Sequence, residues 1–192
     1  MKRAVFSIVI SVLAVFCFAQ QLPPTAQRMG SHFQYAVYVN VDRPSANEGE
    51  VEAIYSVWYA NERMGTVKKL CVTNPMAEAV WNQMLGPEAG AVDVSLQQIA
   101  SAERAWIAPG DVSKVIVEGC PDSRNIWTYI IDTETMTAKQ LPSTEGVQNM
   151  DWEKKEITVA SYGYDSEGRY SYQRVYSIDG KFLRRTGEIE RE

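Results

Sequence analysis

Histidine is almost absent from this sequence, which limits the chemistry the chain can perform. His32 is the single imidazole in 192 residues, so no site here combines two or three histidines. It stands at the start of the first predicted strand, after a proline-containing stretch, where a Ser-His-Asp or Cys-His system would hold its imidazole poorly. We therefore expect His32 to be an ordinary exposed side chain. No Gly-x-Ser-x-Gly turn and no phosphate-binding glycine loop occurs either, so the sequence predicts no cofactor.

Basic residues are also in short supply. Nineteen Lys and Arg stand against 24 Asp and Glu, which gives a net charge of −5 and a pI near 5.1. A general nucleic-acid binder needs a basic face to displace the counterions of the phosphates. The sequence therefore predicts no nucleic-acid partner.

The amino terminus has the pattern of an export signal. Lys2 and Arg3 precede an uncharged apolar stretch from Ala4 to Ala19, which ends abruptly at Gln20. Crossing a bilayer takes about 20 apolar residues, more than this stretch supplies. We expect residues 1–19 to be a signal peptide and the mature chain, without a transmembrane span, to be periplasmic or secreted. Lipid attachment at Cys17 is an alternative, although Phe16 occupies the place where lipoprotein processing requires a small residue.

Two cysteines remain once residues 1–19 are removed. Cys71 and Cys120 are an even pair in an exported chain, which favours one disulfide bond. Closing a loop of roughly 50 residues would stabilise the fold by about 4 kcal/mol. The alternative is two separately buried thiols. Their separation lacks the close ligand spacing of zinc centres, so no metal site is predicted.

The rest of the chain indicates one mainly antiparallel β domain. Residues 20–31 contain Pro23 and Pro24 and are expected to form a flexible leader, and residues 32–192 a single β-rich domain. Apolar residues alternate with polar ones from Phe33 to Val41, the period of a half-buried strand. The other predicted strands are Val51–Tyr59, Val67–Val72, Val115–Val117, Ile126–Asp132, Ala138–Leu141, Ile157–Ser161, Tyr170–Ile178 and Lys181–Arg184.

One or two helices are expected between residues 74 and 108. Asn74 and Pro75 are typical of a helix start, and an approximate apolar stripe runs from Met76 to Leu85. Residues 95–105 fit helical spacing imperfectly.

Three hairpin-like stretches share a pattern in which an aromatic-rich strand, a polar turn and a shorter strand follow one another. They run from Tyr55 to Leu70, from Trp127 to Leu141 and from Tyr172 to Leu183. The segments Val115–Leu141 and Ile157–Leu183 are offset by about 42 residues, a spacing common among four-stranded propeller blades. Propeller-like repeats are therefore one interpretation. A β-rich chain with many hairpins is the other.

Acidic residues offer one route to catalysis without histidine. Paired carboxylates perform hydrolysis when two of them converge in a cleft. The candidates are Asp122, Asp151, Glu153, Asp165 and Glu167. Of these, Asp122, Asp165 and Glu167 stand in predicted turns, where Asp is favoured for local backbone reasons. A carboxylate-dependent hydrolase acting on the cell envelope is therefore the alternative function.

The aromatic residues beyond the predicted signal peptide are mostly tyrosine and tryptophan, and this is the most informative feature of the composition. Beyond residue 19 only Phe33 and Phe182 remain of the phenylalanines, beside ten tyrosines and five tryptophans. Tyr and Arg are enriched at protein interfaces, and aromatic rings stack on sugars. Tyr and Trp also pair across strands without any function. The sequence favours an exported, non-catalytic binding or inhibitory module for a protein or glycan partner. Its predicted binding residues are Tyr162, Tyr164, Arg169, Tyr170, Tyr172 and Arg174.

Overall fold

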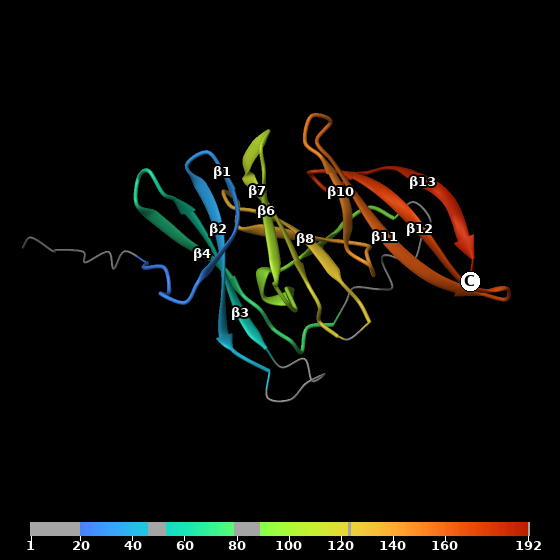
Figure 1. Cartoon of the computed structure of the whole chain (residues 1–192), viewed down its shortest axis with the longest axis horizontal. Helices are drawn as coiled ribbons and strands as arrows, with labels where there is room; N and C mark the ends of the chain where they lie inside the picture. The colour runs from blue at the N-terminus through green and yellow to red at the C-terminus, as the bar shows by residue number, and fades with distance from the viewer. Residues whose placement is uncertain (1–19, 46–52, 79–88, 123, 192) are drawn as a thin grey trace, which may run out of the picture.

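The computed structural model describes residues 20–45, 53–78, 89–122 and 124–191. The predicted signal peptide, residues 1–19, lies outside these ranges. The described chain is mainly antiparallel β-structure arranged in three sheets, which Figure 1 shows side by side from the blue amino-terminal strands to the red carboxy-terminal ones. No helix within these ranges is long and apolar enough to cross a bilayer.

The first and third sheets are four-stranded meanders in which chain order and spatial order coincide. The first sheet consists of β1 (Gln27–His32), β2 (Tyr35–Arg43), β3 (Ile54–Asn61) and β4 (Thr66–Val72). The third sheet consists of β10 (Val147–Asp151), β11 (Glu156–Asp165), β12 (Gly168–Ser177) and β13 (Phe182–Arg191).

The second sheet adds a fifth strand to the same meander. The meander comprises β6 (Arg104–Ala108), β7 (Asp111–Gly119), β8 (Trp127–Asp132) and β9 (Thr137–Leu141). The short strand β5 (Val92–Val94) pairs with β9, so the spatial order is β5-β9-β8-β7-β6.

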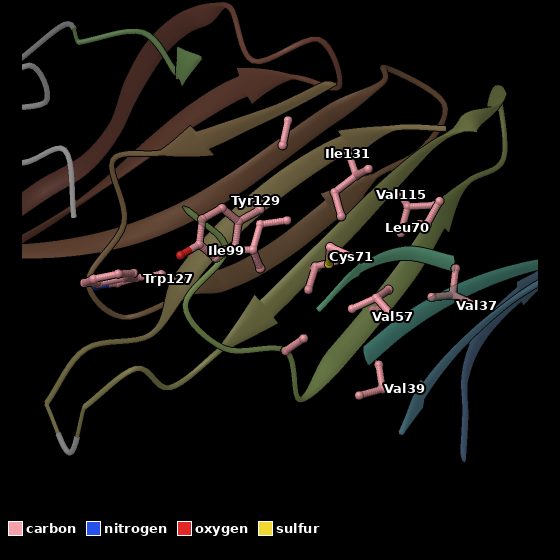
Figure 2. Close-up of a cluster of buried hydrophobic side chains, with 14 of the residues drawn as sticks. Val37, Val39, Val57, Leu70, Cys71, Ile99, Val115, Trp127, Tyr129 and Ile131 are labelled. Carbon is pink, nitrogen blue, oxygen red and sulfur yellow. The ribbon is translucent and has the colours of Figure 1, made fainter. Parts of the chain in front are cut away.

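Two apolar cores hold the three sheets together, and the second sheet contributes to both. Val115 and Ile131 point toward the first sheet and pack with Val37 and Val57, as Figure 2 shows. Their chain neighbours Ile116 and Ile130 point the other way and pack with the third sheet, on Ile157, Val159 and Tyr176. Because successive side chains in a strand alternate between faces, a strand buried on both faces is apolar without interruption. This explains the Val115–Val117 and Tyr129–Ile131 runs.

The predicted strands match the observed ones closely where a period of two or an unbroken apolar run was present. The three hairpin-like stretches are the hairpins β3–β4, β8–β9 and β12–β13, which close the meanders of the first, second and third sheets. The 42-residue offset places β7–β9 in correspondence with β11–β13.

Regular structure begins earlier than the sequence indicated, at Gln27. Strand β1 pairs with β2, and its Gly30 lies directly on the backbone of β6, where an added Cβ would come within 2.6 Å of the Ala105 carbonyl oxygen. The preceding segment is also attached, because the Thr25 hydroxyl donates to Asn40 Oδ1 (2.6 Å) and the Gln20 side chain accepts from the Lys69 amide (2.7 Å).

The expected helices are wrong where the structure describes residues 74–108. Asn74 initiates a turn in which its side chain accepts from the Met76 amide at 3.1 Å, and residues 79–88 lie outside the described ranges. A single 3₁₀ turn, η1 (Leu96–Gln98), follows β5. Residues 104–108 form β6 because Ala105 and Ile107 enter the first core while Trp106 faces the second.

The predicted disulfide is also corrected: Cys71 and Cys120 are free thiols. Cys71 lies in the first core beside Leu70 and Val57 (Figure 2), where it acts as a small apolar side chain. Cys120 follows the end of β7, is partly exposed, and its amide donates to Glu103 Oε1 at 3.0 Å.

Candidate functional site

The β11–β12 hairpin carries all six predicted binding residues, but its register divides them between two faces. Tyr164 is opposite Arg169, and Gly163 is opposite Tyr170. Since directly paired residues of an antiparallel ladder share a face, the six form two groups of three. The outer cluster, on the face away from the second sheet, contains Tyr162, Tyr164 and Arg169. The inner row, on the face that carries Ile157, Val159 and Tyr176, contains Tyr170, Tyr172 and Arg174.

The polar groups of Arg169 and Tyr162 in the outer cluster are already paired with neighbouring side chains. The Arg169 guanidinium lies 4.8 Å from the Tyr162 ring centre and pairs with Glu145 at 2.9 Å. The Tyr162 hydroxyl donates to Asn125 Oδ1 at 3.2 Å, and its ring meets that of Tyr164 edge-on at 6.0 Å. These contacts fasten the hairpin to the segments on either side of β8 and β9. Only Tyr164, which is 71% exposed, presents its ring to solvent.

The inner row is built around two parallel tyrosine rings. Tyr170 and Tyr172 stack with their ring centres 5.8 Å apart and their planes 25° apart. Gly163 provides the space for the first ring, because an added Cβ there would lie 2.6 Å from Tyr170 Cζ. Both tyrosines are partly exposed. The row therefore brings two stacked, partly exposed tyrosine rings next to Arg174.

Arg174 ends this row in the interior. Its guanidinium lies 4.7 Å from the Tyr172 ring centre, and Nη2 donates to the Tyr172 hydroxyl oxygen at 2.7 Å. The side chain is 3% exposed, and its Nε has no hydrogen-bond partner. Among the side chains that the structure describes, which leave out those of Asp165 and residues 187–191, no carboxylate lies within 4.0 Å of Arg174. A guanidinium carries five N–H donors, and at least the Nε donor of Arg174 is unused.

Tyr176 continues the inner face beyond Arg174 and packs into the second core. Its hydroxyl donates to the Ala89 carbonyl oxygen at 3.0 Å. Burial raises the pKa of Tyr176 to about 12, against an opposing effect of the neighbouring Arg174 guanidinium. This phenol is therefore neutral at physiological pH and cannot neutralise the charge of Arg174.

Glu118 is a buried carboxylate that the sequence did not single out. It is fully buried on β7, where its Oε1 accepts hydrogen bonds from the Val147 amide and the Thr128 hydroxyl, while Oε2 pairs with Arg104 at 2.8 Å. Burial raises its pKa despite these partners. Gly146, at φ +75°, leaves the space that this carboxylate fills. Glu118 joins the second sheet to the first strand of the third.

The acidic candidates for hydrolysis lie in local turns or at opposite ends of β11. Asp122 Oδ1 accepts from the amides of Arg124 and Asn125 in a local turn, as the turn interpretation predicts. Asp151 is opposite Glu156 at one end of β11, whereas Asp165 is at the other end, nine residues along the strand. At a rise of about 3.3 Å per residue the two positions are about 30 Å apart. Glu153 is exposed in the turn that precedes β11, and Glu167 is exposed in the β11–β12 turn.

A small cavity of about 250 Å³ opens at the turn end of the second sheet, lined by Lys114, Asp132, Lys139 and Asp179 among others. Its charges are paired internally: Lys114 is 2.6 Å from Asp132 and 3.7 Å from Asp179, and Lys139 is 3.6 Å from Asp93. Partial burial opposes ionisation of Asp132, but the hydrogen bonds from Lys114 and two backbone amides lower its pKa to about 2. We regard this cavity as part of the salt-bridge network of the two turns.

His32 lies at the β1–β2 turn, partly buried, with its ring 4.3 Å from that of Phe33. This turn is far along the chain and in a different sheet from the β11–β12 hairpin. Among the described residues there is no cluster of three metal-ligating side chains.

No family model matches the chain, and neither the curated proteins nor the solved structures contain a significant match to it.

Proposed function

We propose that this chain is an exported, non-catalytic module that binds a glycan on the inner row of the third sheet. The observation that carries the proposal is the stacked pair Tyr170–Tyr172, partly exposed, beside an arginine that has no carboxylate partner in the described residues. Flat tyrosine rings offer an apolar surface with a polar edge, which suits the C–H faces and hydroxyl groups of a sugar. The outer cluster is less suited, because Glu145 already neutralises Arg169.

A carboxylate-dependent hydrolase is the weaker candidate. Such an enzyme needs two carboxyl groups within about 10 Å of each other, and Asp151 and Asp165 are at opposite ends of β11. Glu118 is buried and tied to Val147 and Arg104, which suits a structural role.

Export rests on the residue pattern of the first 19 positions, and we propose a periplasmic or extracellular location on that basis. Mass spectrometry of the chain purified from its native source would test it. We expect a mature chain that begins at Gln20. A full-length chain, or an acylated one that begins at Cys17, would contradict this.

The three meanders support an interpretation as propeller-like repeats. Each sheet places its four meander strands in sequential order, and neighbouring sheets pack face to face through the two cores. Propeller blades pack in this way around an axis. We propose that the chain is an arc of three blade-like sheets, with the inner row on the last of them.

Titration of the purified protein with a panel of glycans, followed by tyrosine fluorescence or calorimetry, tests the proposed binding. The double substitution Tyr170→Ala and Tyr172→Ala should weaken binding at least about tenfold, because stacking of a single ring on a ligand contributes on the order of 1 kcal/mol. Tyr164→Ala is the matched control, since it removes an exposed ring from the opposite face of the same hairpin. Equal affinity of the double variant and the wild type, with the fold intact by circular dichroism, would remove the inner row from the binding site.

A further inference from the structure

Arg174 combines deep burial with the absence of a carboxylate partner among the side chains that the structure describes. Some well exposed cations do have such a partner: the side chain of Arg28 is 47% exposed and pairs with Glu62 at 3.0 Å, and that of Arg184 is 49% exposed and pairs with Glu156 at 2.7 Å. Lys68, Lys69 and Arg185 have none among those side chains, but each is at least partly exposed to water. Arg174 is 3% exposed, contacts the ring and hydroxyl of Tyr172, and has Val159 and a second cation, Arg185, as its cross-strand neighbours.

This arrangement is unfavourable in the absence of a counter-charge. Burying an unpaired charge removes its hydration without replacing it, and proteins therefore pair buried charges or neutralise them. An arginine cannot escape this cost by losing its proton, because a guanidinium stays protonated in proteins. The Tyr172 hydroxyl accepts a hydrogen bond from Arg174, and burial keeps the nearby Tyr176 phenol neutral at physiological pH. A bound anion is the remaining way to balance Arg174.

The row of side chains connects Arg174 with the surface. The Tyr172 hydroxyl that accepts from Arg174 belongs to the ring that stacks on Tyr170, and both rings are partly exposed. A ligand that contacts the exposed parts of the two rings would therefore bring an acidic group toward the guanidinium. Guanidinium forms paired hydrogen bonds with carboxylate, sulfate and phosphate oxygens, which also gives the contact a defined orientation.

We propose that Arg174 is the binding site for an oxyanion, and that the glycan recognised by the inner row carries one, as a uronate or sulfate group. The choice of an acidic glycan rests on the proposed function, whereas the oxyanion site itself stands on the isolation of Arg174. In either case the guanidinium would hold a planar or tetrahedral oxyanion. That oxyanion could come from a free inorganic anion or from the acidic substituent of a sugar.

Thermal unfolding in sodium sulfate tests the oxyanion site without any glycan. Sulfate stabilises most proteins by exclusion from their surface, so the comparison is between variants at equal sulfate concentration, with sodium chloride of matched ionic strength as reference. We expect millimolar sulfate to raise the midpoint of the wild type by several degrees more than that of Arg174→Gln. Arg169→Gln is the matched control, because it removes an arginine that already has a carboxylate partner on the opposite face, and it should respond as the wild type does. The same sulfate response in all three proteins would overturn the site.

Binding of short oligogalacturonates, compared with their methyl esters, tests the glycan source. We expect the free acids to bind at least tenfold more tightly than the esters, and Arg174→Gln to abolish this preference while retaining the weak binding of the esters. Equal binding of acids and esters by the wild type would overturn the acidic-glycan inference and leave the proposed function intact. A sulfate response specific to Arg174 without binding of any glycan would support the oxyanion site and contradict the proposed function.

Discussion

Phe33 occupies a backbone conformation that is unfavourable for its side chain. It lies in the two-residue turn between β1 and β2 with φ +50°, and its ring is 84% exposed. The left-handed region costs a non-glycine residue on the order of 1–2 kcal/mol, and the exposed ring recovers little of this through its contact with His32.

Phe33→Gly should therefore stabilise the fold by about 0.5–1 kcal/mol, since relief of the strain exceeds the greater entropy of glycine in the unfolded chain. Urea unfolding would measure this as a higher midpoint. Phe33→Ala keeps the strained φ and should leave the midpoint nearly unchanged. A lower midpoint for the glycine variant would mean that the phenyl ring stabilises the turn.

Glu118 gives a prediction about pH. Burial raises its pKa in the folded state above the unfolded value, so the unfolded chain releases the proton first as the pH rises. The contribution of Glu118 to the free energy of unfolding is therefore greatest at low pH and falls as the pH rises through the two pKa values. Glu118→Gln removes this titration, so the stability of the variant relative to wild type should increase between pH 4 and pH 7.

Denaturant titrations of both proteins at several pH values would measure this difference. Glu118→Ala is the informative control, because it leaves the partly buried Val147 amide without an acceptor and should cost about 1–3 kcal/mol across the whole range. A difference between the glutamine variant and wild type that stays constant with pH would contradict the assignment.

At the scale of elements, the β8–β9 hairpin depends on Asp132. Its carboxylate accepts from the amides of Glu134 and Thr135 at 2.9 Å and pairs with Lys114 at 2.6 Å. The folded-state pKa of about 2 lies below the unfolded value, so this stabilisation is present above about pH 4 and is lost as the pH falls toward 2.

Asp132→Ala should destabilise the fold by about 2 kcal/mol at pH 7, and the difference from wild type should shrink between pH 4 and pH 3. Asp179→Ala serves as the control, because Asp179 is 70% exposed at 3.7 Å from the same lysine and should contribute little. The two substitutions are compared by urea unfolding. Equal effects from both would argue against a special role for Asp132.

The same scale shows which elements a sequence can predict. Strands with a clear period of two or an unbroken apolar run, such as β2 and β7, could be predicted because side chains alternate between the faces of a sheet. Strand β1 could not, since it forms by pairing with β2 and by the fit of Gly30 against β6, both distant in sequence. Strand β6 shows a mixed apolar pattern because both of its faces are buried, and it was wrongly expected to be helical.

The sequence indicated the residues of the candidate site but not how they are grouped, because their grouping depends on the pairing of strands. Composition identified the tyrosines and arginines of the hairpin, but only the register of β11 and β12 separates Tyr164 and Arg169 from Tyr170. The isolation of Arg174 and the burial of Glu118 depend on contacts between sheets. Local sequence carries no information about which acid lies beside which base in space.

At the scale of the whole molecule, the three sheets are held by apolar cores without a covalent link between Cys71 and Cys120. Burial raises the pKa of Cys71 to about 12, and burial together with Glu103 raises that of Cys120. Thiolates are the reactive form, and since the pKa of both thiols is raised, exposure to the reagent determines which of the two reacts first.

Iodoacetamide should alkylate Cys120 in the native protein well before Cys71, as followed by peptide mass spectrometry. A chain that takes up no label until it is reduced would instead indicate the disulfide.

At the same scale, the third sheet carries the inner row, in which two stacked and partly exposed tyrosines adjoin a buried arginine without a carboxylate partner among the described side chains. A crystal structure of the protein grown with an oligogalacturonate would test this account most directly. We expect a sugar ring on Tyr170 and Tyr172 and its carboxylate about 3 Å from the Arg174 guanidinium. A sugar bound elsewhere, or a carboxylate of the chain itself paired with Arg174, would contradict it.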